Sequence, residues 1–305
     1  MTEEVHSDER SVGSPVWHET MMSSSLPPEI FDLIVDNLRD EPDTLKACCA
    51  VSNSWVSRTR RHLFTRIEFH PNQSSLQSWM RAFSDPSNSP AHHTRSLSIH
   101  DPSILSAAST NVRAWIRAFN RVLHLELGAN QWVVRRSSLA FLHGLSPTLR
   151  SLSITCFSIS SSAVLSLVCT FPSLKDLTFR FLLDNEPDDW AIPSTSPKFT
   201  GALNLVAVPR CWSPTIRRLL DLPGGICFSK VSVKCSSGGT ESMLGLVSRC
   251  FDTLESLYID CTFMGAFLLS STVDQYLIPA HVFSCIRAAS SLRTLQGHET
   301  QGCLV

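Results

Sequence analysis

The chain has 305 residues, of which 43% are hydrophobic and 17% are charged, so it can bury a large core and its length suggests about two domains. Its 26 Lys and Arg residues nearly balance its 27 Asp and Glu residues. This balance argues against a general binder of nucleic acid or membranes and favours a discrete protein partner.

The first segment, residues 1–24, holds acids and serines but no apolar run of the kind that a secretory signal needs. We expect it to be a disordered tail. No later stretch is apolar enough over its length to span a bilayer, so we predict a protein of the cytoplasm, the nucleus or both.

The eleven cysteines are predicted to be free thiols, because no secretory route is indicated and no C-x-x-C pair occurs. No metal site and no cofactor is predicted. The chain also lacks a G-x-G-x-x-G motif, a P-loop and a G-x-S-x-G motif, and no catalytic grouping can be placed, so we predict that it is not an enzyme.

Residues 26–64 are predicted to form three short helices. Prolines at the start and an acid behind them are typical of a helix N-terminus. In the first helix one face is expected to carry Ile30, Leu33, Ile34 and Leu38, with Glu29, Asp32, Asp36 and Arg39 opposite. Asp43 and Ser52 are predicted to cap the second and third helices. A block of this length is near the limit for independent folding, so we expect it to need a partner surface.

The same block resembles the F-box motif, through Leu-Pro-Pro-Glu-Ile at its front, Val51-Ser52 and Trp55 in its middle and Leu63-Phe64 at its end. The resemblance spans residues 25–64 and implies docking to the Skp adaptor of a cullin-RING ubiquitin ligase. The matching positions, which serve either adaptor contact or the small core, are Leu26, Pro27, Ile30, Leu33, Ile34, Leu45, Val51 and Trp55.

After this block a short phrase recurs, with apolar residues at its first, fourth and sixth positions. Its central residues are 25 to 30 positions apart, except for a last interval of 38, and they are Ile67, Leu97, Leu125, Leu152, Leu177, Leu205, Val231, Leu257 and Leu295. Helix-like segments lie between the copies. One strand and one helix per period is the pattern of a parallel solenoid, in which each unit needs its neighbours to cover its apolar face.

This pattern resembles a leucine-rich-repeat array of the helix-backed kind. The resemblance implies a mixed α/β (α+β) chain: three helices, then over residues 65–305 about eight to nine degenerate repeats with short parallel strands on the concave side and helices outside. A doubly wound α/β enzyme is the alternative, and the polar residues between the leucines of each phrase disfavour it.

Alternating positions of the predicted strands identify a solvent-facing surface of mixed charge, which suits a folded protein or a peptide. Candidate target-binding residues on it are Glu126, Asp176, Arg180, Lys230, Lys234, Tyr258 and Asp260. A further candidate is Trp190, in the proline-rich segment Asn185–Pro197.

We therefore expect a substrate-recognition subunit of an SCF-type ubiquitin ligase, whose partners are a Skp-type adaptor, through it a cullin, and an unidentified target protein. Neither nucleic acid nor a membrane is expected as a partner. Two alternatives remain open: a repeat scaffold without a ligase role, and a helix-turn-helix DNA-binding regulator that uses Arg58, Arg60 and Arg61.

Overall fold

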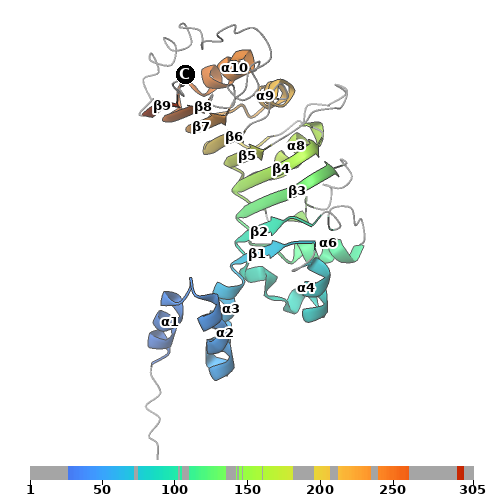
Figure 1. Cartoon of the computed structure of the whole chain (residues 1–305), viewed down its shortest axis with the longest axis vertical. Coiled ribbons are helices and arrows are strands. Elements are labelled where there is room, and N and C mark those ends of the chain that lie inside the picture. The colour runs from blue at the N-terminus through green and yellow to red at the C-terminus, as the bar shows by residue number, and fades with distance from the viewer. Residues whose placement is uncertain are drawn as a thin grey trace, which may run out of the picture.

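The computed structural model describes residues 27–71, 75–101, 104, 110–134, 142, 144–145, 147–159, 161–180, 196–206, 212–234, 240–260 and 294–298. Within these residues the chain is mixed α/β, with three helices followed by one open, all-parallel sheet of nine strands (Figure 1). The predictions for residues 1–24, Leu26 and Trp190 lie outside the described residues.

The helical block comprises α1 (Pro28–Asn37), α2 (Pro42–Val51) and α3 (Asn53–Leu63). Proline stands at the start of α1 and of α2, where its missing N–H has no helical partner to lose. The prediction that Asp43 caps the second helix is wrong, because Pro42 already begins α2 and Glu41 occupies the cap position. Ser52 does cap α3, since its hydroxyl accepts the N–H of Ser54.

Helix α1 packs through a face that differs from the predicted one. Val35 is its buried side chain, and the ring of Phe31 lies 5.3 Å from that of Trp55 on α3. Ile30, Leu33 and Ile34 remain exposed. The helix therefore has a packed apolar side and a second apolar side that faces solvent.

The nine strands follow one another in chain order, so each pairs with the next strand of the sequence. They are β1 (Arg66–Phe69), β2 (Ser96–Ile99), β3 (His124–Val134), β4 (Ser151–Ile159), β5 (Asp176–Arg180), β6 (Ala202–Val206), β7 (Lys230–Lys234), β8 (Ser256–Asp260) and β9 (Thr294–His298). Between them lie α4 (Leu76–Ala82), the 3-10 helices η1 (Pro86–Asn88) and η2 (Pro90–His93), α6 (Thr110–Arg117), α8 (Ser161–Val168), α9 (Trp212–Leu220) and α10 (Thr240–Cys250).

Strand register confirms all but one of the predicted repeat positions. Ile67 is opposite Leu97, and the same rung continues through every strand to Leu257 and Leu295. The exception is β6, where Leu203 rather than Leu205 stands on this rung. Because side chains alternate with a period of two along a strand, this two-residue error leaves Leu205 on the same face of the sheet.

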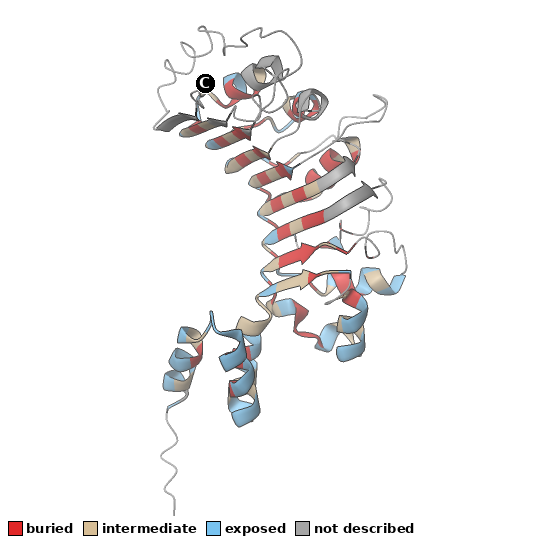
Figure 2. Ribbon diagram, viewed as in Figure 1, coloured by how far each residue is buried: buried red, intermediate tan, exposed pale blue. Residues whose placement is uncertain are grey.

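The helices between the strands lie on one side of the strand column (Figure 1). Burial alternates along the strands (Figure 2), and β5 shows it plainly: Leu177 and Phe179 are buried, whereas Asp176 and Thr178 are half-buried and Arg180 is exposed. A sheet with helices on a single side is consistent with a solenoid-like fold. A doubly wound sheet carries helices on both faces.

A cluster of aromatic rings joins the helical block to the sheet. Phe64, the first residue after α3, makes edge contacts with Trp79 and Phe83 at centroid distances of 5.6 and 6.0 Å. Phe69 of β1 contacts Trp79 and Phe119 in the same cluster. The core of the sheet is thus continuous with the end of α3.

Among the described residues, no helix combines the length and the apolarity that crossing a membrane requires.

Candidate partner-binding surfaces

Four large apolar side chains of the helical block face solvent, and we name them the apolar set: Ile30, Leu33, Ile34 and Val51. Their exposed fractions are 42%, 59%, 37% and 74%. Burying one such side chain contributes about 1.5–3 kcal/mol, so a partner that covered several of them would gain substantial binding free energy. The helices that carry them stand at the end of the molecule that lies beyond β1 (Figure 2).

The other predicted adaptor-binding residues have different environments. Pro27 is exposed. Trp55 is half-buried against Phe31, and Leu45 is only 1% exposed. Leu45 therefore belongs to the small core of the block and is not available to a partner. Sequence alone did not separate the two roles, because core and contact positions are both apolar.

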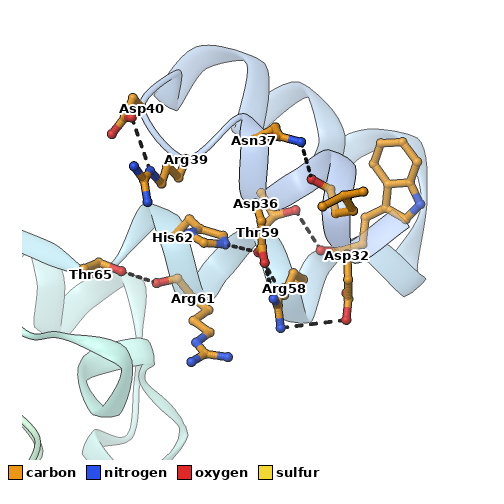
Figure 3. A network of polar contacts seen from close by, with 12 residues as sticks. Asp32, Asp36, Asn37, Arg39, Asp40, Arg58, Thr59, Arg61, His62 and Thr65 are labelled. Atoms are coloured by element: carbon orange, nitrogen blue, oxygen red, sulfur yellow. Dashed lines mark hydrogen bonds and ion pairs between the residues drawn. The ribbon is translucent and has the colours of Figure 1, made fainter. Parts of the chain in front are cut away.

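A polar network holds α1 against α3 (Figure 3). The Nε of Arg58 donates a hydrogen bond to Asp36 Oδ1 over 2.8 Å, and its Nη2 atom pairs with Asp36 Oδ2. The Nε2 of His62 lies 2.7 Å from Asp36 Oδ1, and the carboxylate of Asp32 lies 3.7 Å from Arg58. Two turns of α3 are thereby tied to one carboxylate of α1.

This network sets the charge state of its members. The hydrogen bond from Arg58, followed by that from His62, holds the pKa of Asp36 well below its ordinary value. The bond to Asp36 in turn raises the pKa of Arg58. Arg58, one of three arginines that a DNA-binding helix would use, is thus engaged inside the block. Arg60 and Arg61 are exposed, and the side chain of Arg61 points away from the network (Figure 3).

The predicted target-binding residues are spread over several rows across the strands. Arg180 is exposed, and its row continues through Val206 to Lys234 and Asp260, which stand opposite one another. Glu126 and Tyr258 are both half-buried and lie far apart on β3 and β8. The exposed Lys230 begins β7. The register therefore brings together Lys234 and Asp260, and keeps most of the other candidates apart.

Asp176 has a structural role that sequence reasoning missed. Its Oδ1 atom accepts the backbone N–H of Ala202 over 2.6 Å, which fastens the start of β5 to the start of β6. A Cβ at Gly201 would lie 2.1 Å from this same oxygen. Asp176 and Gly201 thus form one unit, in which the glycine makes room for the carboxylate.

A stacked histidine pair lies at the ends of β1 and β2. The rings of His70 and His100 are nearly parallel, with centroids 4.9 Å apart. Gly128 lies beneath His100, since a Cβ there would come within 2.5 Å of its Nδ1 atom. The repeat period, which places these three residues at equal distances from the central residues Ile67, Leu97 and Leu125, is the sequence signal that could have identified them.

The thiols of the half-buried Cys169 and the buried Cys250 are poor nucleophiles at neutral pH, because desolvation raises the pKa of each to about 11. In the part of the chain that the structure describes, no group of three or more His, Cys, Asp or Glu side chains is placed to hold a metal ion.

No protein-family model matches this chain, and no curated protein sequence matches it either. The geometry of its surfaces therefore carries the functional argument.

Proposed function

We propose that this chain is the substrate-recognition subunit of an SCF-type cullin-RING ubiquitin ligase. In this proposal the helical block is an F-box that docks a Skp-type adaptor, and the strands form a leucine-rich-repeat-like array that holds the target protein. The chain itself would catalyse nothing. Its contribution would be proximity, which makes ubiquitin transfer to a target lysine effectively intramolecular.

The observation that carries the proposal is the apolar set on α1 and α2. Ile30, Leu33, Ile34 and Val51 are exposed although the block has buried side chains of its own, among them Val35 and Leu45. These four exposed residues are positions that match the F-box motif in sequence. Exposed apolar residues gathered in one small block of helices are typical of a surface that a partner covers.

The sequential parallel strands support the second half of the proposal. In strands such as β4, β5 and β6 the residues between the buried apolar positions are half-buried or exposed, and the register places these positions side by side along the sheet. An extended surface of this kind suits a folded target or a peptide.

The test is capture of the full chain by a purified Skp-type adaptor. Replacing two members of the apolar set, in the double variant Ile30→Asp with Leu33→Asp, should weaken capture at least about a hundredfold, because each change places a charge in an apolar interface. Circular dichroism should show that the variant keeps its fold, since both side chains are exposed.

A matched control places two new aspartates at exposed polar positions of the same block, Asn53→Asp with Ser57→Asp. We expect this control to bind the adaptor as wild type does. Equal capture of wild type and the Ile30→Asp, Leu33→Asp variant would contradict the docking assignment, and so would failure of the wild type to bind any Skp-type adaptor.

A further inference from the structure

A row of cations runs along the edge at which the strands begin. Each of the first six strands, β1 to β6, is preceded within five residues by an exposed Lys or Arg, and we name these residues the basic edge: Arg61, Arg95, Arg121, Arg150, Lys175 and Lys198. The exposed Arg66 at the start of β1 is paired with Glu68 and is not part of this set. In Figure 1 the strands begin on the left of the column, opposite the helices.

Backbone hydrogen bonds place three of these residues, Arg95, Arg150 and Lys175, in one row, in which Leu123 holds the position before β3. The carbonyl of Arg95 accepts the N–H of Leu123, whose carbonyl accepts the N–H of Arg150, and the carbonyl of Arg150 accepts the N–H of Lys175. At the other end, Thr65 connects Arg61 to Arg95: its hydroxyl donates to the carbonyl of Arg61, and its carbonyl accepts the N–H of Arg95.

Among the described residues none of the six cations of the basic edge forms an ion pair within 4.0 Å. The nearby acids are engaged elsewhere: Glu68 pairs with Arg66, and Asp176 accepts the N–H of Ala202.

Positive charges near the start of the basic edge contribute to the lowered pKa of a neighbouring side chain, His93. Burial lowers the pKa of His93 on η2 below its ordinary value, and nearby positive charges lower it further. Those charges belong to His92, Arg61, Arg121 and Arg60. Cations from α3, η2 and the start of β3 therefore converge at the beginning of the basic edge.

We propose that the basic edge binds a short acidic polypeptide segment of a partner protein. Six rungs span roughly 24 Å at about 4.8 Å per strand, a length that about seven extended residues cover. Guanidinium and ammonium groups that form no ion pair with another described residue are complementary to Asp and Glu side chains. This assignment does not require adaptor docking, and if the chain is a ligase receptor, the segment belongs to its target.

Acidic residues at both ends limit what the edge can hold. Beyond its start lie the exposed Asp40, in the turn between α1 and α2, and Asp43 of α2. Beyond its end, after Lys230 of β7, lie the exposed Asp252 and Glu255 before β8. A long nucleic acid would extend from the row onto these charges, whereas a short peptide would not. The net charge of −1 also gives no long-range field for a polyanion.

The test measures fluorescence anisotropy of labelled probes with the full chain. The probes are a peptide of about eight alternating Asp and Glu residues, the same peptide with Asn and Gln, and a short DNA duplex. We expect the acidic peptide to bind, with an affinity that falls as salt is added, and the neutral peptide not to bind.

Charge reversal in Arg121→Glu with Arg150→Glu should weaken binding of the acidic peptide by about tenfold or more. The matched control, Arg113→Glu with Arg249→Glu, changes the net charge equally at exposed positions of α6 and α10 and should lose less than about threefold. If the reversed variant does not fold, the neutral variant Arg121→Gln with Arg150→Gln replaces it, with a smaller loss expected.

Four results would overturn the proposal: no binding of the acidic peptide by wild type, equal losses in the two double variants, tighter binding of the DNA duplex than of the peptide, or self-association that charge reversal abolishes. The adaptor test is separate. The Arg121→Glu, Arg150→Glu variant should still be captured by the adaptor, and the Ile30→Asp, Leu33→Asp variant should still bind the peptide.

Discussion

At the scale of single residues, Asp36 is the side chain on which the helical block most depends for its polar contacts. It is the common partner of Arg58 and His62, so one carboxylate from α1 satisfies two groups of α3. Periodicity alone places Asp36 on the polar face of its helix, where a solvated side chain is the ordinary expectation. The sequence does not show that the neighbouring helix brings two basic groups to that face.

Replacing this carboxylate in Asp36→Asn should destabilise the block by about 1 kcal/mol, because Arg58 and His62 lose their charged partner at a site that solvent still reaches. Hydrogen exchange of the α1 amides and urea unfolding would measure the loss. Asp40→Asn is the control: Asp40 and its partner Arg39 are both largely exposed, so stability should change by less than about 0.5 kcal/mol.

The same residue predicts a pH dependence. The pKa of Asp36 in the folded protein lies below its ordinary value of 3.8, so its contribution to stability is fully present above that value and is lost as the pH falls further. Stability of the wild type relative to Asp36→Asn should therefore shrink below about pH 4. A constant difference between the two proteins from pH 7 to pH 3 would contradict this role.

At the scale of elements, the strands could be predicted well and the orientation of α1 could not. The apolar phrase fixes each strand because one face must be buried, and a two-residue error such as Leu205 for Leu203 preserves that face. Helix α1 is apolar on both sides, with Val35 buried and Leu33 exposed. Periodicity cannot decide which of two apolar faces packs, because that choice depends on the position of α3.

Register between β5 and β6 should depend on the unit formed by Asp176 and Gly201. Asp176→Ala removes a hydrogen bond to the N–H of Ala202, and Gly201→Ala pushes a Cβ into the carboxylate, so each should cost about 1–2 kcal/mol in urea unfolding. The double variant should lose less than the sum of the two, because the carboxylate that the new Cβ would meet is gone. Losses that add within about 0.5 kcal/mol would contradict the coupling.

At the scale of the whole molecule, the helical block and the sheet are joined without a linker. Helix α3 ends at Leu63 and β1 begins at Arg66. Of the two residues between them, Phe64 packs on Trp79 and Phe83, and Thr65 bonds to Arg61 on one side and to Arg95 on the other. The position of the block relative to the strands is therefore set by the fold.

Inserting three glycines between Phe64 and Thr65 should release this joint while leaving both parts folded. Small-angle scattering should show a larger and broader distribution of molecular dimensions than in wild type. The reason is that a flexible segment would then separate Phe64, at the end of the helical block, from Thr65, at the start of the sheet. The same insertion between the exposed Ser84 and the half-buried Asp85, after α4, lies off the path from block to sheet and should change the distribution little. If the chain has the proposed function, the insertion at the joint should reduce ubiquitin transfer in a reconstituted ligase more than it reduces adaptor binding, since the distance from adaptor to target is then no longer fixed. Equal losses in transfer and in binding would show that the rigid joint has no part in the activity.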